Sequence, residues 1–255
     1  MIDVSNVTIS FEEKNEPHLV LDQVSLHVEK GEFICLLGPS GCGKSTLLNV
    51  MAGFLKPSSG TICIEGKPVE KPSMEYVTIF QNYGLLPWRT VQKNVELGLE
   101  TKKYSKEKKK EIAKNYLEMV GLSQAAKKRP AQLSGGMQQR VAIARALAVE
   151  PKILFMDEPF GALDAITRMK LQNDILEIAH NTQKTVVFVT HDIEEAVFLA
   201  DRIVVMSANP GKIKGILKVD LPKHRDRTAS DFWMVRDKVY EMFNMKAEET
   251  IEYYI

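Results

Sequence analysis

Long apolar runs are missing from this sequence, and no stretch is long enough to cross a bilayer as a helix. The first residues lack the basic start and apolar centre of a secretory signal. We therefore expect any action at a membrane to pass through another chain. The formal net charge is only +1, which gives no reason to expect nucleic acid or an acidic membrane as the main partner. A lysine-rich run at 102–110 is interleaved with Glu107, and we favour a solvated helix face over nucleic-acid binding there.

Cysteine is scarce as well. The chain has three cysteines, Cys35, Cys42 and Cys63, an odd number in apolar or loop settings. This argues against a disulfide framework and favours reduced thiols in the cytoplasm. The composition is otherwise ordinary, 44% hydrophobic and 26% charged over 255 residues. That length is enough for one large α/β domain or two small ones.

A phosphate-binding loop is the most informative stretch. It follows the apolar run 33–37, expected to be a buried strand, and precedes a stretch from Leu47 that begins like a helix. The pattern G-x-x-x-x-G-K-S in this context aims backbone N–H groups and a helix N-terminus at one anion. We expect Lys44 to reach the terminal phosphates and the Ser45 hydroxyl to ligate Mg²⁺. The alternative is a glycine-rich turn that binds nothing, but both flanks fit the loop. The loop comprises Gly38, Pro39, Ser40, Gly41, Cys42, Gly43, Lys44, Ser45 and Thr46.

The apolar pattern divides the chain into regions. Alternation predicts strands between residues 2 and 36. From about 88 to 150 helical periodicity replaces the strand patterns. Strand patterns return after residue 152, and an amphipathic helix is expected near the end of the chain. The later strands are expected at 61–65, 77–80, 153–156, 186–189 and 203–206.

Two acids follow the apolar run 153–156. A carboxylate at the end of a strand beside the phosphate-binding loop can hold Mg²⁺, which suits Asp157. Glu158, one residue on, can position a water molecule as general base. The alternative is a pair of surface acids after a core strand, which does not account for the loop upstream.

A second candidate anion site lies at residues 133–140. Ser134 is a natural N-cap, followed by two glycines and a helix. A helix N-terminus attracts anions. Taken alone, this stretch fits an anion site and a simple capping turn equally well.

Together these stretches resemble ATP-binding cassette (ABC) ATPases, and the resemblance covers nearly the whole chain. Six motifs occur in the family's order: Walker A at 38–46, the Q-loop Gln81, the signature at 133–137, Walker B at 153–158, the D-loop at 161–164 and the switch His191.

The resemblance implies a role for each matching residue. Gln81 would contact the attacking water, and it would bind Mg²⁺ together with Ser45 and Asp157. His191 would hold the γ-phosphate, and a merely structural histidine is the weaker alternative. Phe11 stands where the family places an aromatic residue on adenine, although a core phenylalanine is the alternative. The remaining ATP contacts would come from the loop 38–46 and from Ser134, Gly135, Gly136, Gln138 and Asp164.

Three further segments resemble one importer group, the nitrate, sulfonate and taurine importer ATPases. They are residues 84–91, 208–213 and 219–225. The chain departs from that group at Asn209 and at Lys223-His224, which leaves the substrate open. Relatives in the group carry nitrate, bicarbonate, alkanesulfonates, taurine or thiamine precursors.

The resemblance implies an α/β fold of the P-loop NTPase (RecA-like) type. A parallel-sheet core would carry an N-terminal antiparallel β subdomain and an inserted helical subdomain at about 88–150. Residues 1–230 would form the nucleotide-binding domain and 231–255 a helical extension. Two copies, or this chain and a second ABC ATPase, would enclose ATP head to tail. They would drive permease subunits at the cytoplasmic face of the membrane, supplied by a separate solute-binding protein.

Other members of the family provide the rival interpretation. A non-transport ABC ATPase of DNA repair, chromosome structure or translation usually adds a coiled coil, zinc modules or a second cassette. An exporter is usually fused to transmembrane helices. The sequence contains none of these additions.

Cys42 lies in the loop near a helix N-terminus, which lowers the pKa of a thiol. We favour a small filler residue as its native role, but still expect alkylation that bound ATP would block. Tyr83, Leu85, Leu86 and Trp88 place apolar surface after Gln81. By resemblance they would line a groove for a permease helix, and the alternative is that they only pack the helical subdomain.

Overall fold

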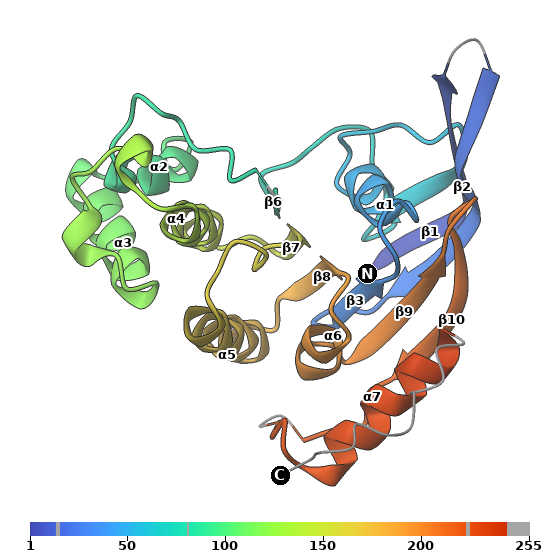
Figure 1. Ribbon diagram of the computed structural model, residues 1–255. Helices are drawn as coiled ribbons and strands as arrows, with labels where there is room; N and C mark the ends of the chain where they lie inside the picture. The colour runs from blue at the N-terminus through green and yellow to red at the C-terminus, as the bar shows by residue number, and fades with distance from the viewer. Residues whose placement is uncertain (14–15, 81, 223–224, 244–255) are drawn as a thin grey trace.

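The computed structural model describes residues 1–13, 16–80, 82–222 and 225–243. The strands form two sheets with helices around them (Figure 1). The antiparallel sheet has the order β2-β1-β4-β5, with bounds Glu16–Val28, Ile2–Glu13, Ser59–Ile64 and Lys67–Pro68. The second sheet has the order β10-β9-β3-β8-β7-β6, with bounds Lys212–Lys218, Arg202–Ser207, Phe33–Leu37, Thr185–Thr190, Ile153–Asp157 and Tyr76–Ile79. The α-helices are α1 (Lys44–Met51), α2 (Val91–Glu96), α3 (Lys106–Met119), α4 (Gly135–Ala148), α5 (Ala165–Thr182), α6 (Ile193–Leu199) and α7 (Ser230–Met242), and short 3-10 turns occupy Leu97–Leu99, Ser123–Ala125 and Pro130–Gln132.

The central strands β3, β7 and β8 are continuous apolar runs because both of their faces are covered. Every residue of β3 and β8 is buried. Successive residues face opposite ways: Cys35 belongs to a core that reaches the helical region, and Leu36 to a core shared with α1 and the antiparallel sheet. Burial on both faces is therefore the physical reason that these runs predicted central strands correctly.

The expected fold class is confirmed. β3, β6, β7, β8 and β9 run parallel, and β1 pairs antiparallel with β2 and with β4. Two strands had not been expected: the short β5, antiparallel to β4, and β10, antiparallel to β9 at the edge of the second sheet. The longer of the two is β10. Its residues alternate between exposed and half-buried positions, the pattern of a strand with one covered face.

Between β6 and β7 the described residues form helices and loops, without a strand. Figure 1 shows α2, α3 and α4 on the far side of β6 and β7 from α1 and the antiparallel sheet. α3 buries Ala113 and Leu117 on one face and exposes most of its lysines, including Lys108, which pairs with Glu111 at 3.2 Å. From Lys106 onward the lysine-rich run is thus a solvated helix face, as expected, whereas residues 102–105 are exposed and precede the helix.

The last described helix, α7, packs along the second sheet. Phe232 and Val239 are buried in the core that also contains β3 and β8. The division at residue 230 into a domain and an extension stays a prediction, and residues 244–255 lie outside the described part. Among the described residues no helix is both long and apolar enough to cross a membrane.

Candidate active site

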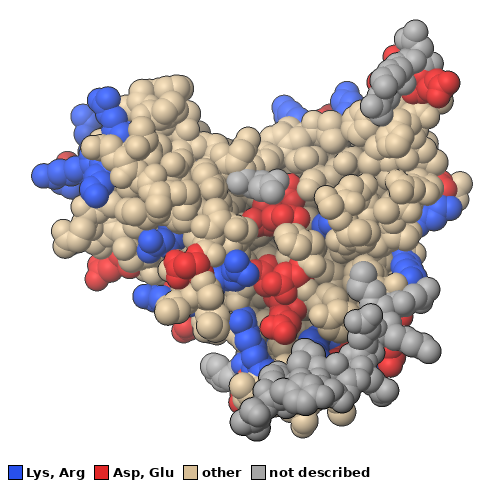
Figure 2. Space-filling view, in the orientation of Figure 1, with Lys and Arg blue, Asp and Glu red and all other residues tan. Residues whose placement is uncertain are grey.

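The carboxyl ends of three adjacent parallel strands bring the candidate site together. β3 leads into the phosphate-binding loop and α1, β7 ends at Asp157, and β8 ends one residue before His191. Ligands of open α/β sheets bind at this edge. Figure 2 shows acidic side chains in the middle of the visible face, in the region where Figure 1 places the ends of β7 and β8. Lys44 lies close enough to Asp157 at this edge for the two charges to interact.

The loop has the tight backbone that its glycines predict. Gly43, the N-cap of α1, has a φ of 89°, which favours glycine. A Cβ atom on Gly38 would lie 2.7 Å from Cys42 Sγ and 2.9 Å from the Met206 carbonyl oxygen, so no side chain fits there. Lys44 is 5% exposed, and its ammonium group donates to the carbonyl oxygens of Gly38 and Pro39 at 2.8 and 2.9 Å. The backbone of the loop thus encloses the Lys44 ammonium group.

Ser45 and Asp157 form the first contact between the loop and the strand ends. The Ser45 hydroxyl donates to Asp157 Oδ1 at 2.8 Å. Burial raises the pKa of Asp157; the Ser45 hydrogen bond opposes this, and the charge of Glu158 adds to it. A cation at this position would offset that repulsion and favour the charged carboxylate.

These two oxygens fit Mg²⁺. Hydroxyl and carboxylate oxygens are the hard donors that this ion prefers. Mg²⁺ usually takes one or two protein ligands and completes its shell with water and substrate phosphates. The described residues contain no group of three or more His, Cys, Asp or Glu side chains able to hold a metal.

Glu158 and His191 form the second contact, between the ends of β7 and β8. Glu158 Oε1 lies 3.1 Å from His191 Nδ1. The Glu158 N–H donates to the Val189 carbonyl at 3.0 Å, and its φ of 44° is unusual for a residue other than glycine. The His191 side chain is 66% exposed. An exposed histidine beside an acid can reach a ligand, whereas a buried structural histidine could not.

The stretch at 134–138 lies apart from this pair of contacts. Ser134 caps α4 by accepting from the Met137 N–H at 3.3 Å, and Gln138 donates to the Leu133 carbonyl. A Cβ atom on Gly136 would lie 3.1 Å from the Ala162 carbonyl oxygen, so the two segments are close neighbours in one chain. Two residues on, Asp164 caps α5 through Thr167 N–H, which lowers its pKa. Within the described chain, no hydrogen bond joins 134–138 to the phosphate-binding loop.

Phe11, Cys42 and Gln81 differ in how the structure bears on their expected roles. Phe11 is 44% exposed on β1, so the core alternative is wrong, and stacking on adenine stays a prediction. Cys42 is fully buried, and burial raises the pKa of its thiol more than Lys44 lowers it. The expected lowering of the Cys42 pKa is therefore wrong, and slow alkylation is now the prediction. Gln81 lies outside the described residues.

Sequence reasoning missed two residues that brace the segment after residue 81. Asn94 is fully buried, and its amide bonds to the backbone of Leu86, Arg89 and Thr90. Arg145 on α4 donates to the carbonyls of Tyr83 and Gly84. A polar residue on the apolar face of a predicted helix was the available signal. Between these braces, Trp88 is 68% exposed.

The fold and these contacts define a P-loop NTPase. The family model described as ABC transporter matches residues 21–161. The bicarbonate transport ATP-binding protein CmpD of Synechococcus elongatus is 49% identical over 227 residues, 88% of this chain and 82% of CmpD. The nitrate import ATP-binding protein NrtD of the same organism is 45% identical over 234 residues, 91% of this chain and 84% of NrtD.

A solved structure agrees with these relatives. It is a dimeric post-hydrolysis state of the ATP-binding cassette MJ0796 bound to ADP and Pi, with a TM-score of 0.81 and 35% identity over 87% of this chain and all of that one. This chain belongs to the ABC transporter family. It is an ATP-binding ATPase of that family, as the sequence motifs predicted.

Proposed function

We propose that the chain is the ATP-hydrolysing subunit of an ABC importer for a small solute. The similarity to a bicarbonate transport protein and a nitrate import protein, at 49% and 45% identity, carries this proposal. Sulfonates, taurine and thiamine precursors stay in the candidate set because the departures at Asn209 and at Lys223-His224 leave the solute open.

The proposed chemistry assigns each group at the sheet edge a task. Lys44 and the loop N–H groups bind the phosphates of ATP. Glu158 accepts a proton from the attacking water, and His191 fixes the γ-phosphate next to it. Ser45 and Asp157 would hold Mg²⁺, with Gln81 as a further ligand; the ion supplies positive charge to the phosphate oxygens. The 3.1 Å contact between Glu158 and His191 supports this division of labour.

The proposed active unit contains two cassettes, either two copies or this chain with a second ABC ATPase. Within the described residues, the stretch 134–138 makes no hydrogen bond to the phosphate-binding loop of its own chain, so another chain would have to present it. Each ATP would lie between one chain's loop and the other chain's Ser134, Gly135, Gly136 and Gln138, with Asp164 at the interface. The dimeric MJ0796 cassette with ADP and Pi supports this arrangement.

The proposed membrane contact is the loop 84–90. Tyr83 and Leu85 pack partly into the core beneath it, and Asn94 holds its backbone. Trp88 stays exposed, which disfavours a role in packing alone. A short permease helix seated here would place the chain at the cytoplasmic face of the membrane, with a solute-binding protein on the other side.

Reconstitution tests the proposal. The chain is placed in proteoliposomes with the permease and solute-binding protein encoded beside its gene, and ATP hydrolysis is measured with nitrate, bicarbonate, taurine, alkanesulfonates and thiamine precursors. We expect one of these solutes to stimulate hydrolysis. Stable assembly with no stimulation by any of them would contradict the solute class, and failure to assemble with a permease would favour a non-transport ATPase.

A further inference from the structure

A buried polar network lies behind His191, and the proposed chemistry does not use it. Its centre is Glu195 on α6, a residue that is 8% exposed. Glu195 Oε2 accepts from the Thr190 hydroxyl at 2.8 Å, and Oε1 accepts from Gln172 Nε2 at 3.0 Å. Burying a carboxylate costs free energy unless hydrogen-bond donors surround it. The same hydrogen bonds hold the side chains of Thr190 and Gln172 in place.

The network holds the backbone on both sides of His191. Thr190, which donates to Glu195, also accepts from the Asp192 N–H at 3.0 Å. The Thr190 hydroxyl therefore bridges the residues before and after the histidine. Asp192 in turn caps α6 by accepting from the N–H groups of Glu194 and Glu195. His191 projects from a short turn that is tied at both ends to the start of α6.

Arg168 on α5 connects this turn to the segment 161–164. Its Nη2 donates to the Leu163 carbonyl at 3.3 Å. The same guanidinium lies 3.9 Å from Glu195 and 4.0 Å from Asp192. Since Ala162 lies against Gly136, the network reaches from the switch histidine toward the stretch at 134–138.

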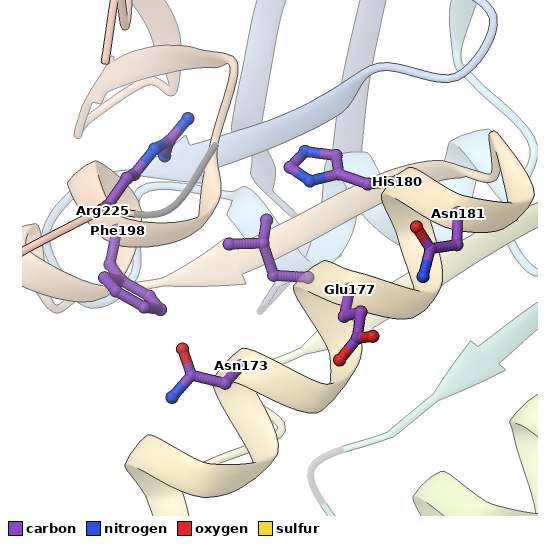
Figure 3. Close-up of a pocket in the computed structure, with 7 residues that line it drawn as sticks. Asn173, Glu177, His180, Asn181, Phe198 and Arg225 are labelled. Carbon is purple, nitrogen blue, oxygen red and sulfur yellow. The ribbon is translucent and has the colours of Figure 1, made fainter. Parts of the chain in front are cut away.

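At its other end the network reaches the segment after β10. Arg227 donates to Gln172 Oε1, and its guanidinium lies 4.0 Å from the centre of the Phe198 ring. Beside this contact, Phe198 and Arg225 face α5 across a pocket of about 440 Å³ (Figure 3). The bond between Arg227 and Gln172 is therefore a discrete point of attachment beside an open space.

We propose that Glu195 is a positioning residue for His191, and that Gln172 and Arg227 extend this positioning to the segment after β10. The inference rests on the proposed role of His191 in ATP hydrolysis. Glu195 touches no reacting atom; it acts by holding Thr190 and thereby the turn that carries the histidine. A misplacement of about 1 Å in a catalytic group can cost about 100-fold in rate, so loss of a single anchor has a measurable effect.

The test compares variants of the full chain. Glu195→Ala removes the anchor, and Thr190→Val removes only the hydroxyl at nearly constant volume. Glu195→Gln keeps an acceptor for Gln172 and is the conservative rescue. Glu194→Ala, an exposed acid one residue earlier, is the matched control. The measurements are kcat and Kd for ATP, the Tm, and the imidazole resonance of His191, assigned by its loss in His191→Gln.

We expect kcat to fall about tenfold in Glu195→Ala and Thr190→Val, with Kd for ATP within about twofold. The His191 resonance should shift in both, and Glu195→Gln should recover most of kcat. Arg227→Ala should shift the resonance less, because it acts through Gln172. An unchanged kcat in both variants, or a lower kcat with an unmoved resonance, overturns the proposal. Normal turnover in His191→Ala would instead contradict the role of His191 itself, and the positioning role with it.

Discussion

The two halves of the proposed ATP site differ in how completely one chain builds them. At the sheet edge, hydrogen bonds already join the loop to β7 and β7 to β8, through Ser45 with Asp157 and Glu158 with His191. At the start of α4, Ser134 bonds to its own helix, Gly136 lies against the neighbouring 161–164 segment, and Gly135 lies against the Tyr83 hydroxyl. At the sheet edge, hydrogen bonds fix the side chains relative to one another, whereas the start of α4 is a capped helix end.

The difference follows from the elements that carry each half. Strand ends in a parallel sheet are neighbours by construction, so residues far apart in sequence meet at one edge. The start of α4 belongs to the helical region on the far side of β6 and β7. A helix N-terminus attracts an anion, and an exposed one can bind an anion that another chain holds. We therefore propose that the sheet-edge half of the site forms within one chain, and that the start of α4 makes its ATP contacts across two chains.

The largest expected effect comes from a substitution in the sheet-edge half of the ATP site. Lys44→Ala removes the compact charge enclosed by the loop, and ATP affinity should fall about 100-fold or more. Lys114→Ala, on the exposed face of α3, is the matched control and should leave affinity unchanged. Isothermal titration with ATP measures both. Near-normal affinity in Lys44→Ala would mean that the loop N–H groups alone bind the phosphates.

A smaller effect is expected from a substitution in the exposed loop 84–90, beside the helical region. Trp88→Ala removes an exposed aromatic anchor from a braced loop, and affinity for the permease should fall on the order of 30-fold. Trp233→Ala on α7, where the indole is 42% exposed, removes a comparable ring elsewhere. Pull-down of the permease from detergent extracts compares them. Equal binding by wild type and both variants would favour a packing role for the loop.

The smallest effect concerns how tightly the loop is closed. Burial raises the pKa of the Cys42 thiol, so at neutral pH it is protonated and shielded. Cys63 on β4 is partly exposed and provides the comparison within the same chain. Alkylation of Cys42 should be at least about tenfold slower than that of Cys63, as measured by peptide mapping. Faster labelling of Cys42 would show that the loop opens readily.

Motif order and strand pattern were enough to predict most of the fold. The apolar runs at β3, β7 and β8 identified the buried sheet because burial on both faces leaves only apolar residues. Strand β10 was missed because its sequence does not follow its alternating burial: Gly215 takes a half-buried position, and Ile216 is exposed. The periodicity of 88–150 predicted helices but not where they lie relative to β6, which long-range packing decides.

The site was predicted less completely than the fold. Residues with a motif, such as Lys44 and Asp157, could be named because their chemistry depends on local spacing. Gln172 and Glu195 could not, since only the tertiary structure brings these two side chains together. Asn94 was missed although its partners are close in the sequence, because its place on an apolar helix face was not interpreted. The pKa of Cys42 was predicted in the wrong direction for a similar reason. The nearby helix N-terminus can be recognised from local sequence, but the burial that raises the pKa depends on the whole loop.

Sedimentation velocity of Glu158→Gln, with and without ATP, tests the proposed division of the site most directly. An amide cannot take the proton from water, so ATP should bind and stay intact. We predict a monomer without ATP and a dimer with it, and a monomer in both conditions for the double variant Glu158→Gln, Ser134→Arg. A Glu158→Gln chain that binds ATP yet stays monomeric at high concentration, or a double variant that dimerises equally well, would contradict the claim that two chains share each site.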